Sequence, residues 1–182
     1  MTKKVRRSYR VMIEAAEEVK QALSSSCYRI EIAGSLRRRE GDAGDIEFVA
    51  VPKLFKDFVG DMMYPSPLDL KLQSLDVEIA KNGNKYKQLY WNLQSGLVMQ
   101  ADLFLQPDPA TWGVNFMLRT GDAKFSHLMV TKQMYGGYMP DQYNVREARV
   151  WENSVALPTP EEESLFELWG MDYIKPENRK RR

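Results

Sequence analysis

The sequence contains a single cysteine, Cys27, and a single histidine, His127. One cysteine excludes a disulfide within the chain and a cysteine-rich zinc site, and one histidine excludes a metal site built from several histidines of one chain. Any metal site must therefore consist mostly of carboxylates, which favours Mg²⁺ or Mn²⁺ over zinc.

Long hydrophobic runs are also absent. No apolar stretch approaches the roughly 20 residues of a membrane-spanning helix, and no signal-peptide pattern opens the chain. The chain has 182 residues, 43% hydrophobic and 28% charged, which is typical of a folded globular protein of one domain or two small lobes. We therefore expect a cytoplasmic protein with no membrane partner.

The formal net charge of +1 hides an uneven distribution. Residues 1–39 hold ten Lys or Arg and four Glu, whereas the remaining 143 residues hold sixteen positive and twenty-one negative side chains. The last four residues, 179–182, are all basic. Basic ends around an acidic middle favour a polyanionic partner and a carboxylate site, although charged termini can also serve only to stay solvated.

The hydropathy pattern predicts an α+β fold. Apolar residues at a spacing of three to four predict a helix over 6–24, and alternation predicts a strand over 28–33. The other expected elements are strands over 45–52, over 97–105 and within 138–151, and helices over 68–79, 125–134 and 161–170. Pro107 and Pro109 indicate a boundary between two lobes.

The segment 34–47 (GSLRRREGDAGDIE) carries the strongest chemical signal. Asp45 and Glu47 lie two apart on a predicted strand, so both carboxylates project from one face. The Gly34-Ser35 turn offers backbone N–H groups and a hydroxyl to a phosphate, and the arginines at 37–39 match phosphate oxygens. Carboxylates that hold Mg²⁺ beside a phosphate-binding turn favour phosphoryl transfer.

Asp102 interrupts an otherwise apolar strand. A charge there costs stability unless it is paired or bound to metal. Taken singly, each feature has an ordinary structural explanation: a solvated strand face, a surface arginine cluster, an ion-paired aspartate. Their joint occurrence favours a site.

These residues also carry a family resemblance. The segment 34–47 resembles the nucleotidyltransferase signature of family X DNA polymerases, the group of DNA polymerase beta, in which Gly-Ser lies eleven residues before the first metal-binding Asp, as Gly34 does before Asp45. Further similar stretches are Lys85-Tyr86, QADLFL around Asp102, Thr120-Gly121 followed by Phe125, and the segments 157–162 and 173–179.

The resemblance implies an α+β fold with two parts. Residues 1–106 would form the nucleotidyltransferase palm, a mixed β-sheet packed on helices, and residues 107–182 a small α/β thumb. The signature comes too early for the helix-hairpin-helix fingers and lyase domain that usually precede it. We therefore expect a free-standing polymerase core of the small bacterial or phage-encoded type.

The resemblance also implies the site residues. The catalytic, metal-binding carboxylates would be Asp45, Glu47 and Asp102, holding two Mg²⁺ ions for which Mn²⁺ can substitute. The nucleotide-binding residues would be Gly34, Ser35, Arg38, Gly44, Gly121, Asp122 and Lys4. Ser126 and His127 would lie near the nascent base pair.

Five positions depart from the family pattern. Glu47 replaces the usual Asp, and Gln100 replaces the Arg two residues before the third carboxylate. Leu118-Arg119 replaces an aromatic pair that helps to reject a ribose, which makes ribonucleotide use a hypothesis to test. Val130 replaces a basic residue that contacts the template.

The expected function is that of a minimal DNA polymerase: Mg²⁺-dependent addition of nucleotides to a primer 3′-hydroxyl with release of pyrophosphate, with gap-filling repair as one setting. The partners would be a DNA primer and template and a dNTP, or an NTP. Two alternatives stay open: a template-independent nucleotidyltransferase, or one acting on RNA or another acceptor, and a non-catalytic nucleic-acid-binding module. The oligomeric state does not follow from the sequence.

Overall fold

The computed structural model describes residues 5–53 and 66–179. Contacts divide the chain into two compact units. Unit 1 consists of Met1–Ile32 and Gly41–Pro107, and unit 2 consists of Ala33–Glu40 and Asp108–Arg182. The expected α+β class is confirmed, since helices accompany a mixed sheet. The short segment Ala33–Glu40, which the sequence assigned to the first domain, groups with unit 2.

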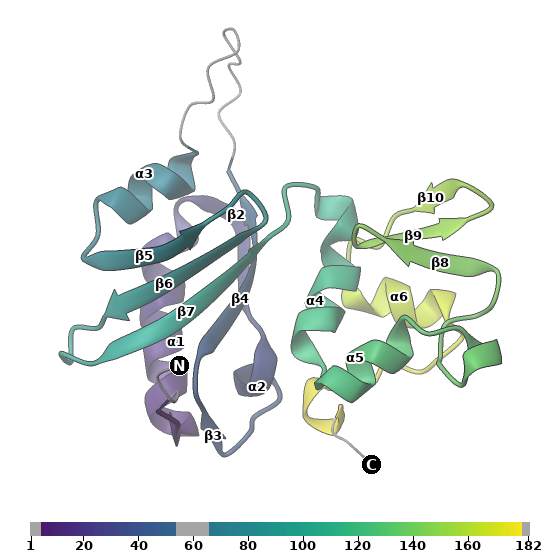
Figure 1. The fold of residues 1–182 in the computed structure, drawn as a ribbon, viewed down its shortest axis with the longest axis horizontal. Coiled ribbons are helices and arrows are strands. Elements are labelled where there is room, and N and C mark those ends of the chain that lie inside the picture. The colour runs from purple at the N-terminus through teal and green to yellow at the C-terminus, as the bar shows by residue number, and fades with distance from the viewer. Residues whose placement is uncertain (1–4, 54–65, 180–182) are drawn as a thin grey trace, which may run out of the picture. The chain divides into compact units, whose positions relative to one another are not determined.

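Unit 1 contains a five-stranded sheet (Figure 1) in the order β2-β4-β7-β6-β5. Its strands are β2 (Cys27–Ile32), β4 (Ile46–Pro52), β5 (Val77–Asn82), β6 (Tyr86–Asn92) and β7 (Val98–Leu105). Strands β4 and β7 are parallel, and every other neighbouring pair is antiparallel. A separate two-stranded pair joins β1 (Arg7–Ser8) to β3 (Asp42–Ala43).

One face of the sheet is apolar and packs on helix α1 (Tyr9–Ser24). The helix buries Met12, Ala15, Ala16, Val19 and Leu23, which recur every three to four residues and form one stripe. In β7 every second residue faces this core, where Ala101 and Leu103 are fully buried. Figure 1 shows α1 running along the back of the sheet. Burial of this stripe explains why the periodicity of 6–24 predicts the helix correctly.

Helix α3 (Pro67–Gln73) is shorter than the predicted helix over 68–79. It begins with a capping box, in which Ser66 and Asp69 bond each other's backbone N–H groups. It ends at Gln73, with Ser74 as its C-cap, and Val77 already pairs with Trp91 of β6. Strand pairing therefore overrides the helical spacing in this segment.

Unit 2 contains helices around a small sheet. The helices are α2 (Gly34–Arg37), α4 (Trp112–Thr120), α5 (Ala123–Met129) and α6 (Glu162–Leu168). The antiparallel strands are β8 (Tyr143–Arg146), β9 (Arg149–Glu152) and β10 (Val155–Leu157), and 3₁₀ turns are η1 (Pro109–Thr111), η2 (Gln133–Tyr135) and η3 (Pro176–Asn178). Helix α5 ends five residues before the limit predicted from the sequence.

The core of unit 2 forms between α4, α5, α6 and β9. Its buried side chains are Val114, Met117, Phe125, Met129, Met139, Val150, Leu165, Phe166 and Trp169. Helix α4, which the sequence does not predict, contributes to this core and passes close to the chain before α6. A Cβ on Gly113 would lie 2.0 Å from the carbonyl oxygen of Glu161, so only glycine permits that approach.

Among the helices in the described part of the chain, none is long and apolar enough to cross a membrane.

Candidate active site

The three carboxylates predicted to hold metal all belong to unit 1, on or beside neighbouring strands. Glu47 of β4 is the register partner of Asp102 of β7, and Asp102 is in turn the partner of Gln88 of β6. Register partners on neighbouring strands lie about 4.8 Å apart and project from the same face. Glu47, Gln88 and Asp102 therefore form a row across three strands. We call this side of the sheet the polar face.

Asp102 is held by neutral hydrogen-bond donors. Its Oδ1 accepts from the Tyr86 hydroxyl at 2.9 Å and from Gln88 Nε2 at 3.2 Å. Gln100 Nε2 donates to both carboxylate oxygens, at 3.1 and 3.0 Å. Asp102 is only 7% exposed, so its carboxylate is fixed in orientation although none of these partners is a cation.

Asp45 and Glu47 flank the start of β4. Asp45 occupies a bend immediately before the strand, and Glu47 is its second residue. Both are half-buried and both have interaction partners in the structure. Within residues 5–53 and 66–179, no group of three or more Asp, Glu, His or Cys side chains is close enough together to hold a metal ion. Glu47 and Asp102 lie opposite each other on neighbouring strands, but the three carboxylates do not form a cluster.

The donor set nevertheless fits a hard divalent cation. Mg²⁺ prefers carboxylate oxygen ligands, and Asp45, Glu47 and Asp102 supply only such oxygens. A nearly buried carboxylate is stabilised by a cationic partner or a metal, and the described donors to Asp102 are all neutral. The chemistry of the residues therefore supports an Mg²⁺ site at the polar face.

The predicted phosphate-binding segment forms the one-turn helix α2 in unit 2. Gly34 begins it with a φ of +60°, a conformation that glycine adopts without strain. Ser35 is half-buried, and its carbonyl oxygen accepts from the backbone N–H of Glu40. Gly44, by contrast, lies in unit 1 in the bend before β4, and Lys4 lies outside the described residues.

Arg38 is closely held by its surroundings. Its Nη1 donates to the carbonyl oxygens of Thr120 and Gly121 at 2.9 and 3.0 Å, while Nε and Nη2 both donate to Glu40 Oε1. The residue is 9% exposed. Arg38 thus connects α2 to the C-terminal end of α4, and most of its N–H groups are engaged within the protein.

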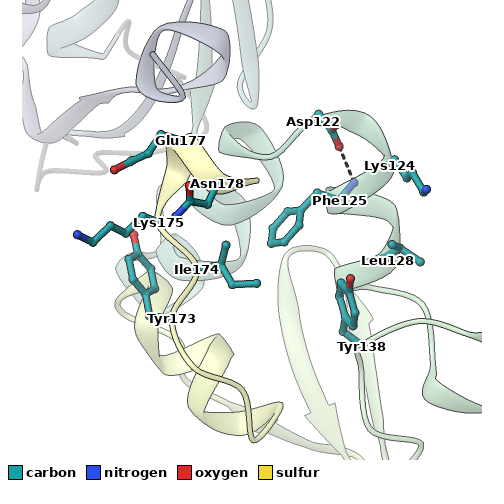
Figure 2. A pocket seen from close by; sticks show the side chains of 10 residues that line it. All are labelled: Asp122, Lys124, Phe125, Leu128, Tyr138, Tyr173, Ile174, Lys175, Glu177 and Asn178. Atoms are coloured by element: carbon teal, nitrogen blue, oxygen red, sulfur yellow. Dashed lines mark hydrogen bonds between the residues drawn. The ribbon is translucent and has the colours of Figure 1, made fainter. Parts of the chain in front are cut away.

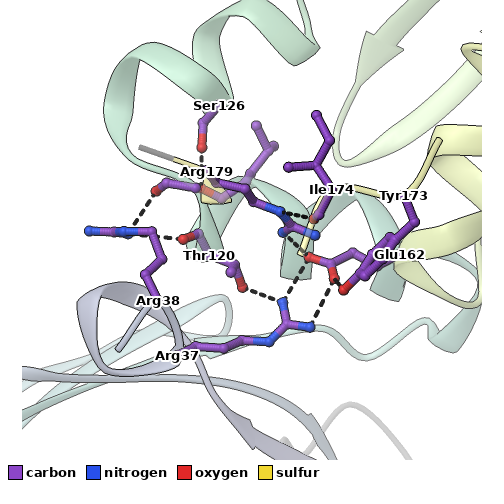
Figure 3. A network of polar contacts seen from close by, with 10 residues as sticks. Arg37, Arg38, Thr120, Ser126, Glu162, Tyr173, Ile174 and Arg179 are labelled. Carbon is purple, nitrogen blue, oxygen red and sulfur yellow. Dashed lines mark hydrogen bonds and ion pairs between the residues drawn. The ribbon is translucent and has the colours of Figure 1, made fainter. Parts of the chain in front are cut away.

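Arg37 belongs to a buried ionic network that the sequence analysis did not identify (Figure 3). Its Nη1 and Nη2 donate to the two oxygens of Glu162, each at 2.8 Å. Arg179 Nη1 donates to Glu162 Oε1 at 2.5 Å, and the Tyr173 hydroxyl donates to Oε2 at 2.9 Å. Glu162 is 2% exposed and Arg179 is fully buried.

Electrostatics keep Glu162 ionised. Burial alone raises the pKa of this carboxyl, but hydrogen bonds from Arg37 and Arg179, together with their charges, more than compensate, so its pKa lies below the usual value. Burial and the neighbouring Glu162 charge raise the pKa of Tyr173. The only signal in the sequence for this network was that its members lie in the segments 34–47, 157–162 and 173–179 that resemble the family.

Gly121 and Asp122 have clear roles in the backbone. A Cβ on Gly121 would lie 2.6 Å from Ser126 Oγ and 2.7 Å from Phe125 Cδ1, so glycine lets α4 and α5 join tightly. Asp122 is the N-cap of α5, because its Oδ1 accepts from the Phe125 backbone N–H at 2.7 Å. Ser126 Oγ donates to the Leu118 carbonyl oxygen, and His127 is exposed.

Comparison with known proteins identifies no family for this chain: no protein-family model matches it, and no curated protein matches its sequence.

Proposed function

We propose that this chain is an Mg²⁺-dependent nucleotidyltransferase that adds nucleotides to the 3′-hydroxyl of a DNA primer. The observation that carries the proposal is the pairing of Glu47 with Asp102 on parallel strands, where Asp102 is nearly buried and its hydrogen bonds come from neutral donors. Two neighbouring carboxylates supply the oxygen ligands that a divalent cation serving phosphoryl transfer prefers.

Asp45, Glu47 and Asp102 would hold the metal. When bound, Mg²⁺ stabilises negative charge on the phosphate oxygens during transfer. In the reaction, the primer 3′-hydroxyl gives up its proton to solvent and its oxygen forms a bond to the α-phosphorus of the nucleotide. The bond between the α-phosphorus and the α,β-bridging oxygen breaks, which releases pyrophosphate. Tyr86, Gln88 and Gln100 fix the orientation of the Asp102 carboxylate.

Further residues are proposed to bind the nucleotide. Ser35 supplies a hydroxyl, and Arg38 supplies a guanidinium with a remaining N–H for a triphosphate oxygen. Gly34, at the start of α2, and Gly44, in the bend before β4, offer backbone N–H groups. Gly121 is proposed to lie beside the nucleotide sugar, and its own N–H donates to the Met117 carbonyl oxygen. Asp122 and Lys4 complete the proposed set.

Primer extension tests this proposal. Labelled DNA primer is incubated with the protein, with and without template, with dNTP or NTP, and with Mg²⁺ or Mn²⁺. We expect extension that Asp102→Asn and Asp45→Ala reduce by at least about 100-fold, the scale of losing an essential electrostatic group. The matched control is Glu78→Gln, since Glu78 is an exposed carboxylate on the edge strand β5, outside the proposed site.

The outcomes separate the alternatives. Templated extension that depends on Asp102 supports the proposal. Untemplated tailing that depends on Asp102 indicates a nucleotidyltransferase with another acceptor requirement. If Asp102→Asn and Glu78→Gln both behave as the unaltered protein does, the assignment of the polar face to nucleotide transfer is wrong.

A further inference from the structure

Unit 2 contains an open pocket of about 910 Å³ (Figure 2). It lies beside α5 and the chain segment that leads into η3. The lining residues are Asp122, Lys124, Phe125, Leu128, Tyr138, Tyr173, Ile174, Lys175, Glu177 and Asn178. Pockets for small organic ligands measure roughly 300–1,000 Å³, so this pocket is large enough for a nucleotide unit.

Aromatic and aliphatic side chains form about half of the pocket lining. Phe125 and Tyr138 form a tilted pair with ring centroids 6.4 Å apart, and Tyr173 adds a third ring. In Figure 2, Ile174 lies between Tyr173 and Phe125, and Leu128 lies next to Tyr138. Tyr138 is 37% exposed, so part of its ring is available to a ligand. Aromatic side chains of this kind stack on planar heterocycles.

Positive charge lies directly behind these walls. Arg179 Cζ is 5.6 Å from the Phe125 ring centroid and 5.3 Å from that of Tyr173. Because Arg179 shares the single carboxylate of Glu162 with the half-buried Arg37, these three groups carry a formal charge of +1. Arg179 Nη2 is buried and has no hydrogen-bond partner among the described residues.

The charged groups that line the pocket are two lysines and two carboxylates, whose formal charges sum to zero. Lys124 and Lys175 are exposed. Of the two carboxylates present, Asp122 is engaged in capping α5, while Glu177 is half-buried. When the +1 charge of Arg37, Arg179 and Glu162 is added, the formal charge in and behind the pocket is positive. Aromatic walls combined with positive charge are typical of surfaces that bind single-stranded nucleic acid.

We propose that this pocket receives an unpaired base of a single-stranded nucleic acid, stacked on Tyr138, with Lys124 and Lys175 beside the flanking phosphates. The inference rests on the proposed function, since it names a further contact of the DNA substrate. It adds a base-binding position in unit 2 to the nucleotide contacts already assigned to Ser35 and Arg38.

Fluorescence anisotropy of the full chain tests the pocket. The probe is a labelled oligothymidylate of about a dozen nucleotides at about 50 mM salt. Removal of a stacking ring in Tyr138→Ala is expected to raise Kd by about 5-fold to 150-fold. Tyr138→Phe keeps the ring and is expected to bind within about twofold of the unaltered protein.

Two controls sharpen the test. Tyr135→Ala removes a tyrosine of the same loop that is 73% exposed but does not line the pocket, and it is expected to leave Kd unchanged. An oligomer of abasic sites with the same number of phosphates is expected to bind the unaltered protein more weakly than oligothymidylate. It is expected to bind Tyr138→Ala about as well as it binds the unaltered protein.

The two proposals fail in different ways. If Tyr138→Ala binds oligothymidylate as tightly as the unaltered protein, or if the abasic oligomer binds equally well, the pocket does not receive a base. In that case Asp102-dependent primer extension can still be measured and would leave the proposed function standing. If the unaltered protein shows no primer extension but binds oligothymidylate more tightly than the abasic oligomer, the proposed function is wrong. The assignment of the pocket to a base would then still stand.

Discussion

Glu47 and Asp102 are register partners on the parallel strands β4 and β7. Successive residues of a strand point to opposite faces, so a shift of one residue in either strand would separate the two carboxylates. The apolar neighbours Ile46 and Ala101 are fully buried on the other face and fix this register. The core of unit 1 thus determines the position of the candidate site.

Gln100→Ala should impair catalysis more than stability. The change removes the amide that donates to both oxygens of Asp102, so the carboxylate loses its fixed orientation. We expect kcat for primer extension to fall about tenfold, as is usual when a support of a metal ligand is lost, with about 1 kcal/mol less stability. Gln94→Ala, at an exposed site, is the control, and equal kcat values for the two variants would contradict this role.

Glu162→Gln should destabilise the protein strongly at neutral pH. It leaves Arg37 and Arg179 without their shared carboxylate, and such a loss costs about 3 kcal/mol. Because folding lowers the pKa of Glu162 from 4.5, its contribution is complete above about pH 4.5 and declines as the pH falls through the folded-state value.

Urea unfolding at pH 7 and at decreasing acid pH measures this effect. The difference in unfolding free energy between the unaltered protein and Glu162→Gln should shrink in acid. Glu163→Gln, at the next residue, which is exposed, serves as control. A difference that stays constant down to about pH 3 would contradict the ionic role of Glu162.

Gly113→Ala should be among the most damaging single substitutions in unit 2. The added Cβ would lie 2.0 Å from the Glu161 carbonyl oxygen and 2.8 Å from that of Thr159, and both are backbone atoms rather than the ends of flexible side chains. We expect a loss of about 3 kcal/mol, seen as a lower urea midpoint. Gly41→Ala, where nothing lies within 4 Å of the new Cβ, should leave the midpoint nearly unchanged.

Lys87→Met should loosen the attachment of α3 to the sheet. Lys87 is 4% exposed, and its Nζ donates to Asp69 Oδ1 at 2.6 Å and also to Asn82. Although burial raises the pKa of Asp69, the hydrogen bond from Lys87 helps to hold it below the usual value. Removing the cation should cost about 3 kcal/mol by thermal or urea unfolding, whereas Lys85→Met at an exposed site should cost little.

Sugar discrimination should be weak. The two positions before Thr120-Gly121 hold Leu118, which is half-buried, and Arg119, which is exposed. The family that this segment resembles has two aromatic residues there. Under the proposed function we expect incorporation of ATP within about tenfold of dATP, a difference of about 1.4 kcal/mol. Steady-state kcat/KM values for the two nucleotides check this, and a preference for dATP by several orders of magnitude would refute it.

Local periodicity predicted the elements that bury a regular apolar stripe. The helix over 6–24 and the strands over 28–33, 45–52 and 97–105 match α1, β2, β4 and β7 to within a few residues at each end. Residue spacing gave no correct prediction where contacts between distant segments determine the secondary structure. Val77 and Ile79 pair with β6 instead of extending α3, and α4 gave no clear pattern because nearly all of its residues are buried.

The candidate site was predictable residue by residue but not in its supporting contacts. Asp102 stood out as a charge in an apolar strand, whereas its hydrogen bond from Tyr86 depends on the register of β6 against β7. The partnership of Arg37 with Glu162 joins residues 125 positions apart, which no local pattern reveals. Such contacts follow from the fold rather than from spacing along the chain.

The assignment of Ala33–Glu40 to unit 2 limits how this protein can be dissected. The chain leaves β2, contributes α2 to the other unit, and returns to β3, so a single cut at Pro107 does not separate two self-sufficient modules. A fragment that begins at Asp108 would lack Arg37 and leave Glu162 without one of its two arginines. A cut at that proline would therefore separate two segments of the same compact unit. The two parts of the chain should be expressed together.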